Sequence, residues 1–139
     1  MTFLSIQSSV SFGYVGNSVA IPTLQKLGYD CWYIHTVYFS NHPGHEQFSG
    51  EFATPNSINK KIQNINEIRG LDNCKAVLSG YLGLSSNAKV VASAVDYVKK
   101  LDDNRLYILD PVIGDDGKVF VKKGIRSSIP VSYTHLRAH

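Results

Sequence analysis

Four short segments of this sequence combine side chains that could do chemistry: residues 8–17, 37–45, 79–83 and 110–117. The first segment places hydroxyls and glycines ahead of an expected helix, and a helix N-terminus favours a polar or anionic ligand group. Its glycines match neither the phosphate-binding P-loop nor the dinucleotide fingerprint. The serines of this segment could equally satisfy their own backbone, so both a binding loop and a plain connection remain open.

The second segment, residues 37–45, combines aromatic, amide and imidazole side chains. A flat aromatic substrate could pack against Phe39. His42 and His45 could bind zinc, but no third ligand is evident in the sequence. A packed polar turn is the remaining interpretation of this segment.

The last two segments supply a tyrosine and carboxylates. Tyr81 stands between Gly80 and Gly83, whereas Asp110 and Asp115 have no apolar residues to cover them. Carboxylates in such a place suit Mg²⁺ that is carried by a nucleotide. The Asp-Asp-Gly run is also ordinary turn chemistry.

The pattern of apolar residues predicts strands and helices in alternation. The expected strands are residues 2–7, 31–36, 75–79 and 105–109, and the expected helices begin at Asn17 or Ser18, at Asn56 or Ser57, and at Ser85 or Ser86. This order indicates an α/β layer with mainly parallel pairing. In open sheets of this kind, ligands collect beyond the carboxyl ends of the strands. We therefore expect four loops, beginning at Ser8, Val37, Gly80 and Asp110, to meet at one edge of the sheet.

The composition predicts a globular protein and argues against disorder, nucleic-acid binding and a membrane span. The chain has 139 residues, the length of one domain, with 43% hydrophobic and 18% charged residues, which argues against disorder. The net charge is +3 and no basic stripe follows an expected helix, so nucleic acid is not an expected partner. No signal peptide is evident and no apolar run approaches the ~20 residues of a membrane span, which favours the cytoplasm. Cys31 and Cys74 lack metal-ligand spacing and are expected to be reduced core thiols.

Five motifs in order make this chain similar to the pyridoxal kinases. They are Ser-Ile-Gln-Ser at residues 5–8, Gly-Tyr-Val-Gly-Asn at 13–17, Val-Tyr-Phe-Ser-Asn-His at 37–42, Leu-Ser-Gly-Tyr at 78–81 and Asp-Pro-Val-Ile-Gly-Asp at 110–115. The related hydroxymethylpyrimidine kinases share the fold, and they are the alternative within the same superfamily. The Phe-Ser-Asn-His segment is not associated with those enzymes.

The resemblance implies a three-layer α/β/α fold of the ribokinase type, with MgATP as phosphoryl donor. The acceptor would be the 5′-hydroxyl of pyridoxal, pyridoxine or pyridoxamine. By matching positions, the resemblance implies a substrate pocket formed by Ser8 at the polar edge of the pyridine ring and by Val15, Val37, Phe39 and Tyr81 as walls. It places Asp110 near the nucleotide phosphates and Asp115 near the metal. Many members carry a threonine where this chain has Pro43, and the lost hydrogen bond would cost only ~1 kcal/mol.

The resemblance also implies a longer parent protein. Residues 1–130 would be the N-terminal part of a kinase domain, and residues 131–139 continue no periodicity and look like a non-native tail. The ATP platform, the glycine-rich anion hole and the aspartate base would lie outside this truncated sheet, so we expect no catalytic residue in the chain and no activity from it alone. The intact parent is expected to be a homodimer. The competing interpretations are a non-catalytic module that binds B6 vitamers and an incomplete gene product without independent function.

Overall fold

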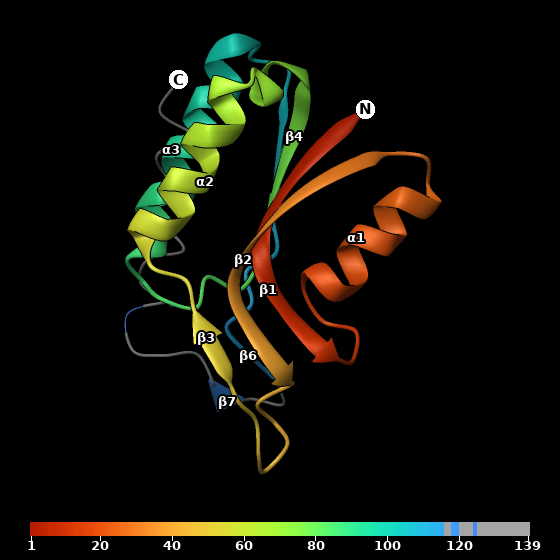
Figure 1. Cartoon of the computed structure of the whole chain (residues 1–139), viewed down its shortest axis with the longest axis vertical. Helices are drawn as coiled ribbons and strands as arrows, with labels where there is room; N and C mark the ends of the chain where they lie inside the picture. The colour runs from red at the N-terminus through yellow and green to blue at the C-terminus, as the bar shows by residue number, and fades with distance from the viewer. Residues whose placement is uncertain (116–117, 120–123, 125–139) are drawn as a thin grey trace.

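The computed structural model describes residues 1–115, 118–119 and 124, and it has a five-stranded sheet between two layers of helices (Figure 1). The strand order is β3-β2-β1-β4-β5. The strands β1 (Thr2–Phe12), β2 (Asp30–Asn41), β4 (Cys74–Ser79) and β5 (Leu106–Leu109) run parallel, and β3 (Gly50–Phe52) is antiparallel to β2. The short β6 (Gly114–Asp115) and β7 (Lys118–Val119) pair with each other. The predicted three-layer, mainly parallel α/β fold is confirmed.

Helices cover both faces of the sheet. The helix α1 (Asn17–Lys26) lies on one face, and α2 (Pro55–Glu67) and α3 (Asn87–Leu101) lie side by side on the other (Figure 1). The cap of α2 is Thr54, whose hydroxyl accepts a hydrogen bond from the amide of Ser57 at 3.2 Å. The helix therefore starts at Pro55, ahead of the predicted start at Asn56 or Ser57. The proline that follows Thr54 is favoured at the first helical position because its φ is already helical.

The core follows the helical periodicity of the sequence. Four apolar residues at helical spacing in α3 are all buried: Ala88, Val91, Val95 and Val98. On α2, Ile58 and Ile62 are buried, but Ile68 is 80% exposed because it lies after the last helical residue.

Cys31 and Cys74 are free and buried, as predicted. Among the described helices, none is long and apolar enough to cross a membrane.

The strands β1 and β2 are longer than the sequence predicted. They pair with each other as far as Phe12 and Asn41, so Ser8 and Val37 lie within strands and the predicted start of a loop at each is wrong. The run of serines from Ser8 to Ser11 has the composition of a loop, but each strand satisfies the backbone of the other. The proposed tail, residues 131–139, lies outside the described residues.

Candidate functional site

The candidate site lies at a step in the sheet, where β4 and β5 end and β1 and β2 continue. The register aligns Ile6 with Ser79 and Ser79 with Leu109. Just beyond this level, the amide of Gly80 donates to the carbonyl of Ile6 at 3.3 Å and the amide of Asp110 donates to the carbonyl of Ser79 at 2.8 Å. The carboxyl ends of the strands therefore bring Ser8, Val37, Tyr81 and Asp110 to one edge of the sheet, as predicted.

A β-bulge in β2 shapes this edge. Gln7 pairs with His35 and Ser9 pairs with Tyr38, so β2 has two residues, Thr36 and Val37, where β1 has one. A bulge breaks the alternation of side chains along a strand. Thr36 and Val37 are both buried, although they are consecutive. The bulge thus turns two neighbouring side chains of β2 toward the interior.

Around Val37 lies an apolar group that we call the aromatic cluster. Its members are the buried Val10, Val37 and Phe39 and the half-buried Val15, Phe52 and Tyr81 that pack against them. The ring of Phe39 lies 5.2 Å from that of Phe52, at 72°, in an edge-to-face arrangement. All four residues predicted as walls of the ring pocket belong to this cluster: Val15, Val37, Phe39 and Tyr81.

The cluster also contains residues that the sequence did not indicate. Phe52 comes from β3, a strand of three residues that had no strand signal of its own. Phe48, in the loop before β3, packs its ring 5.2 Å from that of Phe39. The alternation of apolar residues Val10 and Phe12 along β1 could have pointed to Val10, had residues 8–12 been taken as a strand.

Ser8 is half-buried and lies directly against the segment that leads into α1. Gly16 has φ +54°, and a Cβ there would lie 2.2 Å from the carbonyl oxygen and 2.4 Å from the hydroxyl oxygen of Ser8. Only glycine both tolerates that conformation and leaves room for Ser8. The position of the Ser8 hydroxyl therefore depends on the close approach of this segment.

Beyond the end of β4, Ser18 forms hydrogen bonds with backbone groups of β1. Its hydroxyl accepts from the amide of Val10 at 2.9 Å and donates to the carbonyl of Val10 at 2.7 Å. Because that donation uses the only proton of the Ser18 hydroxyl, Ser9 must be the donor in the 2.9 Å bond between the two serines. One side chain thus replaces the strand partner that Val10 would otherwise lack.

Asn17 is fully buried at the first position of α1 and bonds to two strands of the sheet, β1 and β2. Its amide nitrogen lies within hydrogen-bond distance of the carbonyls of Gln7 (3.2 Å) and Ile34 (3.3 Å) and of Nδ1 of His35 (3.1 Å). Its oxygen accepts from the hydroxyl of Ser5 at 2.7 Å. Because a buried amide is costly to leave unpaired, this network fixes the start of α1 relative to β1 and β2.

Burial lowers the pKa of His35, and the positive charge of Lys61 lowers it further. The amide nitrogen of Asn17 can only donate, so its contact with Nδ1 of His35 fits the neutral ring that carries its proton on Nε2. His35 also stacks between Tyr33 and Tyr38, with ring centroids 5.2 and 5.6 Å away. The neutral imidazole is therefore the form that this structure accommodates.

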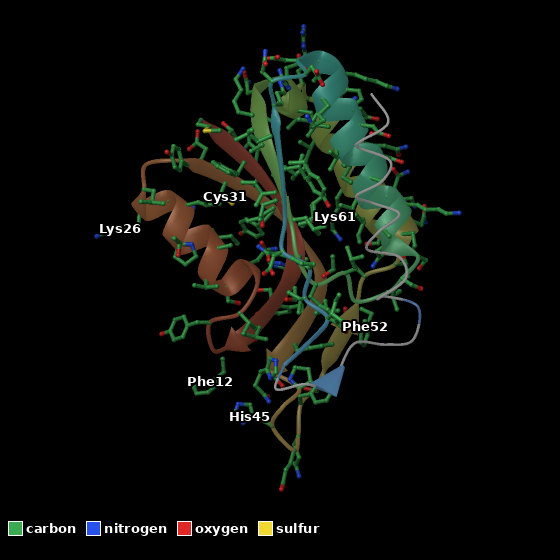
Figure 2. All side chains as sticks on the ribbon, turned by 180° about the vertical axis from the view of Figure 1, so that it is seen from behind. Phe12, Lys26, Cys31, His45, Phe52 and Lys61 are labelled. Atoms are coloured by element: carbon green, nitrogen blue, oxygen red, sulfur yellow. The ribbon has the colours of Figure 1, made fainter. Side chains whose placement is uncertain are left out.

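Pro43 does not join the aromatic cluster. It is exposed in a turn that the amide of His45 closes on the carbonyl of His42 at 3.1 Å, within the loop between β2 and β3. Figure 2 shows His45 at the end of the molecule where Phe12 and Phe52 lie. Nδ1 of His42 accepts from the amide of Gly44 at 3.0 Å. Within the described part of the chain, no three His, Cys, Asp or Glu side chains are grouped as a metal site would require.

Of the two carboxylates predicted for the site, the structure describes the side chain of Asp110 but not that of Asp115. Asp110 is exposed immediately after β5, at the same edge as Ser8. Asp115 lies in β6, and its side chain is outside what the structure describes. The step in the sheet therefore presents one described carboxylate, at the β5 side of the site.

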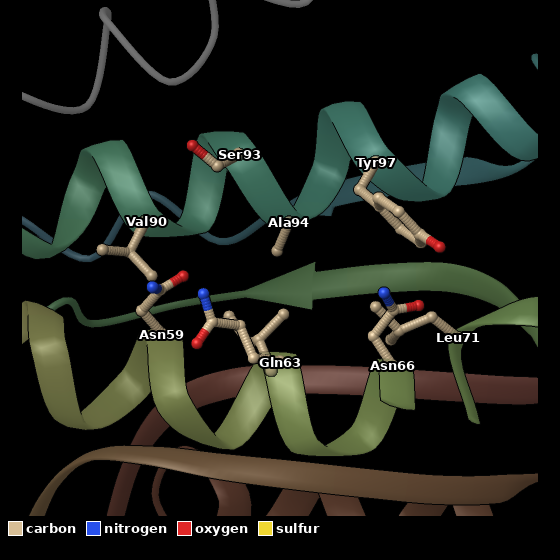
Figure 3. Close-up of a pocket in the computed structure, with 9 residues that line it drawn as sticks. Asn59, Gln63, Asn66, Leu71, Val90, Ser93, Ala94 and Tyr97 are labelled. Carbon is tan, nitrogen blue, oxygen red and sulfur yellow. The ribbon is translucent and has the colours of Figure 1, made fainter. Parts of the chain in front are cut away.

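A groove of about 170 Å³ lies elsewhere, between α2 and α3 (Figure 3). Its lining includes Asn59, Gln63 and Asn66 from α2 and Ser93 and Tyr97 from α3. None of the predicted site residues lines this groove. The candidate site is thus the edge of the sheet and not the groove between the helices.

No protein-family model matches the chain, but it is similar to relatives of known name. The pyridoxal kinase PdxY of Rubrobacter xylanophilus is 42% identical over 126 residues, and that of Deinococcus radiodurans is 47% identical over 120 residues. The alignments cover 90% and 85% of this chain. This chain is related to the pyridoxal kinases. It spans 43% and 40% of the length of these two relatives.

Solved structures show the same relationship. The pyridoxal kinase from Leishmania donovani in complex with ADP and pyridoxamine superposes with a TM-score of 0.90 and 30% identity, over 96% of this chain and 48% of that one. The pyridoxal kinase from Entamoeba histolytica, at 22% identity and a TM-score of 0.85, supports the fold alone. The ribokinase-like sheet of the pyridoxal kinases is therefore the fold of this chain.

The contact between Gly16 and Ser8 predicts an unequal effect of two glycine substitutions. Gly16→Ala and Gly28→Ala each place a Cβ at positive φ, but a Cβ at Gly28 meets nothing within 4 Å. We expect Gly28→Ala to lower the free energy of unfolding by about 1–2 kcal/mol. Gly16→Ala should lower it further, because Ser8 must also move. Urea denaturation measures both, and equal losses would contradict the close approach.

The lowered pKa of His35 predicts a loss of stability in mild acid. The unfolded chain takes up a proton near the ordinary value of 6.5, whereas the folded chain resists it. The contribution to stability is therefore complete above that pH and is lost as the pH falls through the lowered folded pKa. His35→Gln, which keeps an acceptor for Asn17 but does not titrate, should flatten the dependence of the unfolding free energy on pH between about 7 and 5. The exposed His45→Gln is the control, and an unchanged slope in His35→Gln would contradict this account.

Proposed function

We propose that this chain forms the vitamin-binding side of an ATP-dependent pyridoxal kinase. The intact protein would transfer the terminal phosphoryl group of MgATP to the 5′-hydroxyl of pyridoxal, pyridoxine or pyridoxamine, for pyridoxal 5′-phosphate salvage in the cytoplasm. The observation that carries the proposal is the aromatic cluster at the carboxyl edge of the sheet, beside Ser8. Its support is the likeness to a pyridoxal kinase whose complex contains ADP and pyridoxamine.

In this proposal the pyridine ring lies against the aromatic cluster. Val15 and Tyr81 are half-buried and offer surface, whereas Val37 and Phe39 are 2% and 3% exposed and support them from beneath. Burial raises the pKa of Tyr81, so its phenol is neutral at physiological pH. A flat ring packs favourably on such a wall. Ser8, the polar group at this edge, would hydrogen-bond the polar edge of the ring.

Asp110 would serve the nucleotide side, near the phosphates of ATP. Mg²⁺ takes about six oxygen ligands, and one described carboxylate fits a metal that arrives with the phosphates better than a resident one. We assign Asp115 to the metal and the proton-accepting base to a part of the intact protein beyond residue 130. Residues 131–139 would be a non-native tail, and the intact protein a homodimer.

A module that binds B6 vitamers without phosphorylating them is the second candidate. It is favoured by the completeness of the aromatic cluster within residues 10–81, in contrast to the single described carboxylate on the nucleotide side. The two candidates make the same prediction for vitamer binding and differ in turnover. A kinase assay on the intact protein separates them.

The 139-residue chain alone should not phosphorylate pyridoxal at a useful rate. Phosphoryl transfer needs an aligned donor, neutralised charge and a proton acceptor, and groups that act as a unit fail together. A coupled assay for pyridoxal 5′-phosphate, with the purified chain and MgATP, measures this. Turnover of ~1 s⁻¹ or more would show that the catalytic apparatus lies within these residues. Failure of the intact protein to form product while binding pyridoxal would favour the binding module.

Ser8→Ala in the intact protein should weaken pyridoxal binding about fivefold, the worth of one net hydrogen bond of ~1 kcal/mol. The affinity for ATP should change little, because Ser8 belongs to the proposed vitamer side. Ser93→Ala, an exposed hydroxyl on α3 that donates to the carbonyl of Lys89, is the matched control. Titration calorimetry with each ligand makes the comparison. Equal losses for pyridoxal and ATP would mean that Ser8 supports the fold rather than the substrate.

A further inference from the structure

Thr36, which the sequence analysis did not single out, has a side-chain hydroxyl next to the aromatic cluster. This hydroxyl links β2, which carries Val37 and Phe39, to the segment that carries Tyr81. Thr36 is fully buried in the bulge of β2. Its Oγ1 donates to the backbone carbonyl of Tyr81 at 2.5 Å, across 45 positions of the sequence. The bond therefore connects β2 to the segment that leaves β4.

This bond holds the middle of the segment after β4, between other contacts on either side of Tyr81. The amide of Gly80 is held by Ile6 of β1, and the next residue, Tyr81, is held by Thr36 of β2. Two consecutive residues of this segment are therefore bonded to different strands, Gly80 to β1 and Tyr81 to β2. The side chain of Tyr81 leaves the segment at this crossing, so the Thr36 bond sets where the ring begins.

The next turn of the segment rests on the same bulge. Gly83 has φ +71°, and a Cβ there would lie 2.7 Å from Cγ1 of Val37 and 3.1 Å from the carbonyl oxygen of Thr36. The carbonyl of Leu82 accepts from the side-chain amide of Asn87 at 2.9 Å. The backbone on the far side of Tyr81 is therefore also fixed, and Thr36 is the buried side-chain donor at Tyr81 itself.

We propose that Thr36 is a positioning residue that determines the affinity for the vitamer by holding the Tyr81 wall in place. The inference rests on the proposed function, since it concerns the same pocket. A buried carbonyl that loses its donor has a strong tendency to move toward another partner. Loss of the hydroxyl should therefore displace Tyr81 and leave the nucleotide side, which begins at Asp110, unchanged.

The test is a comparison of variants of the intact protein that differ by one hydroxyl. Thr36→Val keeps the shape of the side chain and removes the donor, and it should raise the Kd and KM for pyridoxal roughly tenfold, at an unchanged KM for ATP. Thr36→Ser keeps the donor and should stay within about twofold of the unsubstituted protein. Thr2→Val is the matched control, because Thr2 is also buried in the sheet but at the opposite end of β1. Should Thr36→Val fail to fold, the difference between Thr36→Ser and Thr36→Ala gives the same comparison.

A double-mutant cycle separates positioning from a general effect on stability. In a Tyr81→Ala background the ring is gone, so Thr36→Val should cause no further loss of pyridoxal affinity. A loss of the same size with and without the ring, or pyridoxal binding that Thr36→Val leaves unchanged, would overturn the inference alone. Absence of pyridoxal binding by the unsubstituted protein would overturn the proposed function, and this inference with it.

Discussion

The unequal length of the parallel strands is the constraint on which the site depends. The last pairing of β4 with β1 is at Ile6, yet β1 continues to Phe12 beside β2. A strand that outlasts its neighbour leaves backbone donors and acceptors without partners, and these are costly when buried. Ser18 removes that cost at Val10 by bonding both backbone groups. The start of α1 is therefore tied to the step in the sheet.

The bulge of β2 determines which side chains face the interior at this step in the sheet. Without the extra residue, regular alternation would turn either Thr36 or Val37 away from the interior. With it, a hydroxyl and an apolar side chain act at neighbouring positions. Val37 supports the aromatic cluster while Thr36 holds the backbone of Tyr81. One irregularity thus joins the packing of the cluster to the path of the segment after β4.

The order of elements and the edge that carries the site could be predicted from the sequence, because both follow from local patterns. The spacing of Ala88, Val91, Val95 and Val98 is a property of one helix, and the carboxyl ends of parallel strands meet by topology. The roles of Phe52 and Thr36 could not be predicted in this way. Phe52 joins the cluster through a three-residue strand that exists only by pairing with β2, and Thr36 acts through a partner 45 positions away. Long-range pairing of this kind leaves no periodic signal in the sequence.

The two halves of the proposed chemistry differ in how completely this chain builds them. The contacts within the aromatic cluster, of Ser8 with Gly16 and of Thr36 with Tyr81 come from residues of β1, β2 and β3 and of the segments before α1 and after β4. Asp110, by contrast, follows the edge strand β5, whose outer side has no strand partner among the described residues. The vitamer side is thus held from several directions, whereas the nucleotide side is held from one. Under the proposed function, this arrangement would let recognition of the vitamer be set within the present residues, while alignment of the phosphates would depend on groups of the intact protein beyond β5.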